Sequence, residues 1–275
     1  MIGKEYDGAK PNKRLGQNFL IDDDVLDAIT EAAGIKKGDV VVEIGPGHGE
    51  LTQKLLARKP ARIIAIEKDG SLAQRLVGSL AKQNKNLEII EGDALDIIEN
   101  CKLKIENSTN YKLVGNIPYY ITGYLMRILG ELKRKPSVIV LTMQREVAER
   151  IAAKPGKMNL LSASVQIWGQ PEIQMFIGRH SFNPAPKVDS AIIKITPNQK
   201  LVTNNDPYYK VIKIIFKQPR KTVLNNLKDA VKNGLLGPSA LLLLSEKHSK
   251  LINKRPQDLK IADLKALGLY FGGQN

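Results

Sequence analysis

The feature that most constrains the fold is a regular alternation of short apolar runs with amphipathic stretches. The runs occupy residues 40–44, 62–66, 87–90, 112–115 and 137–142, and an amphipathic helical pattern such as residues 51–58 separates them. Apolar strands that alternate with helices predict a parallel sheet covered on both faces, in an open, doubly wound α/β fold. In such a sheet a ligand is expected beyond the carboxyl ends of the strands.

The pattern changes after about residue 175. Two further strands are predicted at residues 174–177 and 190–196, joined by a proline-rich loop at 182–186, and an antiparallel pair that completes the sheet is the simplest interpretation. Beyond Thr196 and Pro197 the patterns are helical, at 208–217, 221–232, 238–245 and 256–267. We therefore predict one domain at residues 1–197 and a small helical domain at 198–275.

Charge favours a polyanionic partner. The chain has 42 Lys and Arg against 28 Asp and Glu, and nine of its fourteen net positive charges lie in residues 198–275. Such a bias is typical of nucleic-acid binding, although many basic proteins bind none. The single Cys101 permits no internal disulfide, and the sequence has no apolar run long enough to cross a bilayer and no signal for secretion. We expect a soluble, cytoplasmic protein that does not contact membranes.

A glycine-rich turn, Gly45-Pro46-Gly47-His48-Gly49, follows the first predicted strand directly and precedes a helix. Glycines at this place allow the backbone to turn sharply and approach a ligand closely. A purely structural turn or an NAD site would also fit. The third glycine comes one residue earlier than in the dinucleotide pattern, which favours S-adenosylmethionine over NAD.

Acidic residues occur at three consecutive strand ends: Glu43, Glu67 and Asp93. A carboxylate after the second strand can accept hydrogen bonds from both ribose hydroxyls, and one after the third can accept a hydrogen bond from an adenine amino group. Exposed strand ends are often acidic, but this arrangement favours a nucleoside cofactor.

The sharpest motif is Asn116-Ile117-Pro118-Tyr119, at the end of the fourth predicted strand. The lone pair of adenine N6 is delocalised into the ring, so acceptors at the amine protons would localise it toward an incoming methyl group. The Asn116 side-chain oxygen and a neighbouring carbonyl held rigid by Pro118 can accept these hydrogen bonds while Tyr119 stacks on the base. This chemistry needs no metal and no general base. The structural alternative is a turn that ends a strand and buries a tyrosine.

Taken together, these motifs resemble the KsgA family of small-subunit ribosomal RNA adenine dimethyltransferases from about Lys13 to the C-terminus. The segments that carry the likeness are residues 15–20, 43–49, 92–95, 116–119, 143–150 and 182–190. The resemblance implies a Rossmann-like, class I S-adenosylmethionine-dependent methyltransferase sheet with a small C-terminal helical domain. It implies a monomer that dimethylates two adjacent adenines in the 3′-terminal hairpin of small-subunit ribosomal RNA, within an assembling subunit, as a step in ribosome maturation.

The resemblance also assigns residues to roles. Asn116, Pro118 and Tyr119 would be catalytic, and Phe182 would clamp the extruded adenine opposite Tyr119. Arg220 and Lys221 would meet RNA phosphates, although Pro219 stands where a basic residue is common in the family. The cofactor site would contain Asn18, Leu20, Gly45, Gly47, Glu67, Asp93 and Asn116.

Three other functions share parts of this pattern. A methyltransferase that acts on large-subunit RNA and confers antibiotic resistance has the same fold and motifs. A ribosome-assembly factor could keep the fold without needing turnover, and an NAD dehydrogenase would use a similar glycine turn. The run at 182–190 and the pattern Arg220-Lys221 followed by Asn225-Asn226-Leu227 favour the small-subunit enzyme.

Overall fold

The computed structural model describes residues 11–12, 15–100, 105, 110–198 and 206–271. By its contacts the chain divides into two compact units. Unit 1 comprises residues 1–128, 134–148 and 172–197, and unit 2 comprises 129–133, 149–171 and 198–275. The predicted boundary at 198 coincides with one border between the units, whereas unit 2 also takes in residues 129–133 and 149–171, which no sequence pattern separates from the sheet. The extent of independently folding domains stays a prediction.

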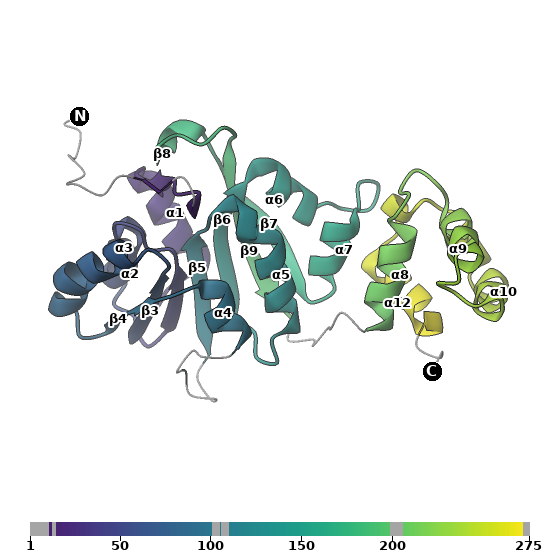
Figure 1. The fold of residues 1–275 in the computed structure, drawn as a ribbon, viewed down its shortest axis with the longest axis horizontal. Coiled ribbons are helices and arrows are strands. Elements are labelled where there is room, and N and C mark those ends of the chain that lie inside the picture. Colours follow the sequence, from purple (N-terminus) through teal and green to yellow (C-terminus); the bar gives the residue numbers. More distant parts are fainter. Residues whose placement is uncertain (1–10, 13–14, 101–104, 106–109, 199–205, 272–275) are drawn as a thin grey trace. The chain divides into compact units, whose positions relative to one another are not determined.

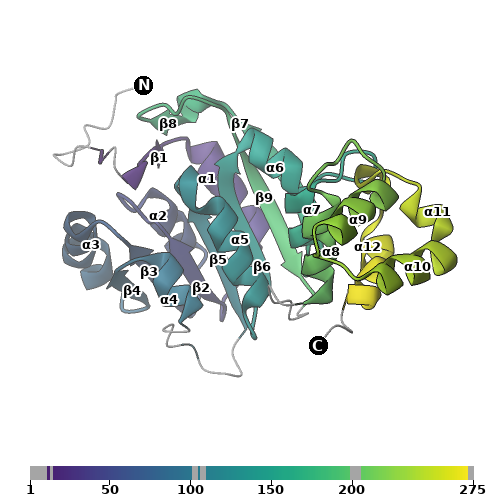
Figure 2. The same ribbon diagram turned by 45° about the vertical axis from the view of Figure 1, so that its right-hand side comes forward.

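Unit 1 contains a seven-stranded sheet in the order β4-β3-β2-β5-β6-β9-β7, with helices on both faces (Figures 1 and 2). Strands β2, β3, β4, β5 and β6 run parallel, and β9 pairs antiparallel with β6. The doubly wound prediction is confirmed. The strands are β2 (Val40–Ile44), β3 (Arg62–Glu67), β4 (Leu87–Glu91), β5 (Tyr111–Asn116), β6 (Val138–Gln144), β7 (Gly169–Ile177) and β9 (Ser190–Pro197).

The first seven α-helices that the structure describes precede β7 in the chain, and capping residues mark the two ends of the first one. Asp22 accepts hydrogen bonds from the backbone N–H groups of Asp24 and Val25, and Gly34 ends the first helix, α1 (Asp23–Ala33), in the left-handed conformation. The helices are α1 (Asp23–Ala33), α2 (Glu50–Ala57), α3 (Gly70–Leu76), α4 (Ala94–Glu99), α5 (Thr122–Glu131), α6 (Arg145–Ile151) and α7 (Leu160–Gln166).

One face of the sheet carries a continuous apolar core. Alternate strand residues such as Val41, Val114 and Val140 pack with Leu26 and Ile29 of α1. All of these side chains are buried, as the alternation of faces along a strand requires. Because this core fixes the strands in register, their carboxyl ends form one edge of the sheet.

A small second sheet was not predicted. Strand β1 (Phe19–Leu20) pairs antiparallel with β8 (Phe182–Asn183), which places Leu20 opposite Phe182. Strands of two residues have no readable periodicity, so sequence patterns could not reveal this pairing.

The C-terminal region is helical, as predicted. Its elements are α8 (Pro207–Ile215), α9 (Val223–Lys232), α10 (Pro238–Lys247), α11 (Ser249–Ile252) and α12 (Ile261–Gly268). The helix expected at 256–267 is divided, because Pro256–Asp258 form a 3₁₀ turn before α12. Helix α9 begins at Val223 because the Thr222 hydroxyl caps it.

Hydrogen bonds explain why residues 149–171 belong to unit 2. The Tyr208 hydroxyl donates to the Ala163 carbonyl at 2.9 Å, and the Tyr209 hydroxyl donates to the Ser164 carbonyl at 3.0 Å. Both acceptors lie on α7, so α8 is fastened to α7 by buried tyrosines.

Candidate active site

A pocket of unit 1 lies at the carboxyl ends of the parallel strands, where the sequence predicts that a ligand binds. Backbone turns, apolar side chains and two carboxylates line it. The lining residues used below are Asn18, Phe19, Gly45, Gly47, Glu67, Lys68, Asp93, Asn116, Pro118, Tyr119 and Tyr120.

The glycine turn forms one wall of this pocket. Gly45, Gly47 and Gly49 all have positive φ, at 68°, 61° and 96°. A Cβ at Gly47 would lie 2.9 Å from the Phe19 ring, closer than real Cβ contacts allow. Position 47 therefore favours glycine for two reasons: its φ is positive, and a side chain there would clash with the Phe19 ring.

Glu67 is held rigidly against this turn. Its Oε2 accepts a hydrogen bond from the Gly47 N–H at 3.0 Å, and its Oε1 accepts one from the Asp69 N–H at 2.9 Å. Burial raises the pKa of Glu67 above its ordinary value, and the backbone hydrogen bonds oppose that shift. A carboxylate fixed in this way presents its remaining lone pairs to a ligand in the pocket.

Asp93 supports α4 while facing the same pocket. Its Oδ1 accepts from the Leu95 N–H at 2.9 Å, and its Oδ2 accepts from Lys68 Nζ at 2.8 Å. Burial alone would raise the pKa of Asp93, but these hydrogen bonds outweigh it and lower that pKa. Asp93 is thus a charged acceptor.

The Asn116-Ile117-Pro118-Tyr119 turn also lines the pocket, beside the glycine turn. Asn116 Nδ2 donates to the Asn18 carbonyl at 2.9 Å, which ties the turn to β1. The Tyr119 hydroxyl lies 2.7 Å from Ser190 Oγ, and burial raises the pKa of Tyr119, so the phenol is neutral at ordinary pH. The turn therefore carries fixed polar groups beside an aromatic ring.

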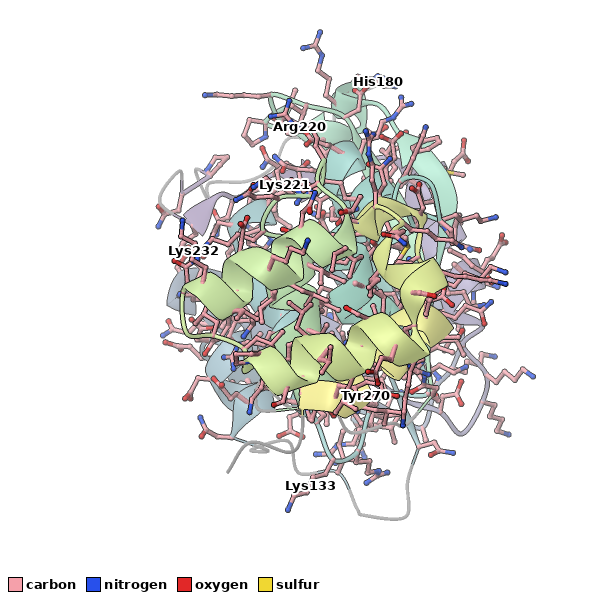
Figure 3. The ribbon with its side chains drawn as sticks, turned by 90° about the vertical axis from the view of Figure 1, so that its right-hand side faces the viewer. Lys133, His180, Arg220, Lys221, Lys232 and Tyr270 are labelled. Carbon is pink, nitrogen blue, oxygen red and sulfur yellow. The ribbon has the colours of Figure 1, made fainter. Side chains whose placement is uncertain are left out.

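Most of the predicted site residues come together here, but not all. Leu20 and Phe182 are each 3% exposed and belong to the apolar core rather than to the lining of the pocket. Arg220 and Lys221 lie in unit 2, at the start of α9, with Lys232 at its other end (Figure 3). Lys221 also pairs with Asp229 at 2.9 Å. The roles of these four residues stay predictions.

The structure adds residues that the motifs did not single out. Thr142 and Ser190 each hydrogen-bond a residue of the Asn116–Tyr119 turn, and Lys68 and Tyr120 line the pocket. No local pattern marks Thr142, because it is an ordinary residue of a buried strand, and Ser190 closes the run at residues 182–190 without a predicted role of its own. Only the register of β6 with β5 and β9 brings them to the site.

Glu43 differs from the expected arrangement. Its side chain is fully buried, accepts a hydrogen bond from the Thr52 hydroxyl at 2.7 Å and does not line the pocket. Burial, more than any neighbouring charge, raises the pKa of Glu43 to about 8. Glu43 links β2 to α2 through this hydrogen bond and does not contact the pocket.

Two absences can be stated for the described parts of the chain. Among those residues, no group of three or more His, Cys, Asp or Glu side chains could hold a metal ion. Nor does any helix within them have the length and apolarity that crossing a bilayer requires.

The strand order, the glycine turn and the acidic residues after β3 and β4 define a Rossmann-like, S-adenosylmethionine-dependent methyltransferase. Comparison with known families is more specific. The model of the family described as ribosomal RNA adenine dimethylase matches residues 8–247, and the chain belongs to that family. The likeness inferred from the motifs is confirmed, and an NAD dehydrogenase is excluded.

Individual relatives agree. The chain is 37% identical to ribosomal RNA small subunit methyltransferase A of Dehalococcoides mccartyi strain CBDB1, over 96% of this chain and 89% of the relative. It is also 37% identical to the protein of that name from Lactobacillus acidophilus, over 92% and 88% of the two chains.

Solved structures extend the comparison. A dimethyladenosine transferase from Plasmodium falciparum is 29% identical with a TM-score of 0.77, covering 92% of this chain and 97% of that one. The 23S rRNA methyltransferase ErmE is 21% identical with a TM-score of 0.69, covering 92% and 99%, and shares the fold.

Proposed function

We propose that this enzyme transfers methyl groups from S-adenosylmethionine to N6 of two adjacent adenines in the 3′-terminal hairpin of small-subunit ribosomal RNA. The observation that carries the proposal is the Asn116–Tyr119 turn, which lies on the same pocket as the glycine turn, Glu67 and Asp93. A site for a nucleoside and a site that accepts hydrogen bonds from an amine are thus adjacent. The names of the curated relatives support small-subunit RNA as the substrate.

The pocket suits the methyl donor. The ribose hydroxyls would bind Glu67, the adenine amino group would bind Asp93, and the glycine turn at Gly45 and Gly47 would approach the rest of the molecule. Asn18 and Asn116 would close the site near the methyl group. Leu20, buried behind this wall, would act by holding β1 in place.

When bound, the donor supplies a methyl group on a positively charged sulfur, which is already a good leaving group. The residues of this chain would then orient the acceptor. The Asn116 oxygen and a carbonyl beside Pro118 would accept hydrogen bonds from the N6 amine, and Tyr119 would stack on the base. As N6 bonds to the methyl carbon, the carbon–sulfur bond breaks, and N6 afterwards releases one proton to water.

Two alternatives remain distinguishable by experiment. Likeness to ErmE is a likeness of fold and gives no support to a large-subunit substrate, whereas both relatives named above carry the small-subunit name. A factor without turnover is disfavoured because the glycine turn and the Asn116–Tyr119 turn are both intact and line one pocket.

The test is methyl transfer from tritiated S-adenosylmethionine to ribosomal subunits isolated from cells that lack this protein. We expect label in the small subunit, at two adjacent adenines of its 3′-terminal hairpin, and none in the large subunit. Label in large-subunit RNA, or no label in either, would contradict the proposal.

The setting of the reaction is part of the proposal. The protein would act in the cytoplasm as a monomer on a partly assembled subunit, contributing to ribosome maturation. The net charge of +14 supports binding to a polyanion of that size. Sedimentation of the purified protein and its co-fractionation with subunit precursors would test these points.

A further inference from the structure

An exposed arginine–phenylalanine pair lies in unit 1, near the Asn116–Tyr119 turn but outside the pocket. The Arg145 guanidinium carbon lies 4.4 Å from the centre of the Phe176 ring. Arg145 begins α6 and Phe176 lies near the end of β7, and the two elements lie beside each other at one edge of the sheet (Figures 1 and 2).

Three contacts link this pair to the proposed catalytic tyrosine. The Arg145 N–H donates to the Asp189 carbonyl at 3.0 Å. The next residue, Ser190, pairs with Gln144 across β9 and β6, and its hydroxyl lies 2.7 Å from the Tyr119 hydroxyl. Arg145 is therefore linked, through the paired ends of β6 and β9, to the serine that contacts Tyr119.

The exposure of the Phe176 ring is unusual for its residue type. The Phe176 side chain is 51% exposed, although phenylalanine is commonly buried, and Arg145 is exposed as well. A stacked cation and ring of this kind presents a flat, positively charged surface to the surroundings.

The exposed charged residues of these elements are of both signs and balance in number. The exposed basic residues Arg179 and Lys187 lie in the segment between β7 and β9, against the exposed acidic residues Glu146 and Asp189. The exposed Asp189 carboxylate accepts a hydrogen bond from the Arg179 backbone N–H at 3.2 Å.

We propose that the Arg145–Phe176 pair stacks on an unpaired nucleobase next to the adenine that enters the pocket. A flipped base leaves its neighbour without a stacking partner, and a flat cationic surface outside the pocket would replace that partner. A phosphate contact would need only a point charge, whereas a guanidinium lying on an aromatic ring offers a plane, which bases prefer. The inference rests on the proposed function and names a positioning surface for its substrate.

The test uses two conservative variants in methylation assays on unmodified small subunits. Arg145→Lys keeps the charge but loses the plane, and Phe176→Leu keeps an apolar side chain but loses the ring. We expect each to raise KM for the RNA on the order of tenfold, with kcat and affinity for S-adenosylmethionine unchanged. Thermal unfolding would establish that both variants fold.

The chain contains a matched control pair. The Arg127 guanidinium carbon lies 4.3 Å from the centre of the Tyr124 ring, and both residues are on α5. The Glu99 carboxylate accepts hydrogen bonds from both side chains and offsets the positive charge of Arg127. Arg127→Lys and Tyr124→Leu should therefore leave KM unchanged.

Each other outcome overturns the inference in a recognisable way. If Arg145→Lys matches wild type while Arg145→Ala raises KM, the contact is with phosphate and not with a base. If the variants lose affinity for assembled subunits but not for naked RNA, the pair binds a protein. If wild type and both variants behave alike, the surface has no role while the proposed function stands. If wild type itself methylates no RNA, the proposed function fails, and this inference falls with it.

Discussion

Thr142 Oγ1 donates a hydrogen bond to Asn116 Oδ1 at 2.5 Å, across the register that pairs these residues on β6 and β5. Thr142 is fully buried, and Asn116 Nδ2 is meanwhile bound to the Asn18 carbonyl. Both contacts require the same orientation of the amide. Since an amide oxygen has two lone pairs, Oδ1 keeps one for a substrate amine.

Replacing Thr142 by valine should slow catalysis without weakening cofactor binding. Valine keeps the shape but removes a hydrogen bond that contributes about 1 kcal/mol, so kcat is expected to fall about fivefold to tenfold. Steady-state kinetics and calorimetric titration with S-adenosylmethionine measure the two quantities. Thr142→Ser is the control and should retain most of the rate; equal rates in the Ser and Val variants would argue against a positioning role.

Asn116→Ala should remove most of the turnover while the protein still binds S-adenosylmethionine. Loss of one oriented acceptor at a reacting group typically lowers kcat about 100-fold to 1,000-fold. Single-turnover methylation of unmodified small subunits is the appropriate measurement. An unchanged rate would refute the catalytic role of Asn116.

Gly47→Ala should weaken cofactor binding at least about tenfold, because the added Cβ would strain a left-handed backbone and displace the Phe19 ring. Gly38 provides the matched control, since it also has positive φ, at 94°, but has nothing within 4 Å of an added Cβ. Gly38→Ala should lower the unfolding temperature without changing affinity for S-adenosylmethionine. Equal affinities of the two variants would contradict the assignment of the turn.

Glu43→Gln should remove a pH dependence of the free energy of unfolding that Glu43 causes in wild type. The pKa of Glu43 is raised from its ordinary value of 4.5 to about 8, so the folded protein holds a proton that the unfolded chain releases between these values. The contribution of this bound proton to the free energy of unfolding is complete below pH 4.5. It is lost as pH rises to about 8, at up to about 1.4 kcal/mol per pH unit.

Thermal unfolding of wild type and Glu43→Gln between pH 5 and pH 8 checks this prediction. Glutamine resembles the protonated acid and can still accept the hydrogen bond from Thr52, so the variant should gain stability relative to wild type as pH rises. A constant difference between the two proteins over this range would mean that Glu43 is ionised when folded.

Neutralising Arg220 and Lys221 together should weaken RNA binding and reduce its salt dependence. Each phosphate contact contributes roughly 0.7 to 0.9 to the slope of log affinity against log salt, so the slope should fall by about 1.4 to 1.8. The double variant Lys36→Ala/Lys37→Ala is a control of equal charge, on the exposed segment before β2. Equal slopes for wild type and the Arg220/Lys221 variant would exclude this surface.

The sequence by itself determined the sheet, the edge of the sheet that carries the pocket and the motifs that line it. Apolar runs must be buried on both faces, and glycines with positive φ and acidic strand ends are local requirements that leave local patterns. Gly45, Glu67, Asp93 and Asn116 could therefore be predicted to share one edge. Likewise α8, α9 and α10 appear in the sequence because each has its own apolar spacing.

Only the tertiary structure decided which ordinary residues support that edge. Thr142 and Ser190 reach the Asn116–Tyr119 turn through strand register, and Arg145 meets Phe176, which lies 31 residues further along the chain. The same is true of the burial of Glu43 and Phe182, which sequence patterns placed at strand ends and in loops. The physical reason is that hydrogen bonding and burial between distant segments depend on packing, and packing leaves no period in the sequence.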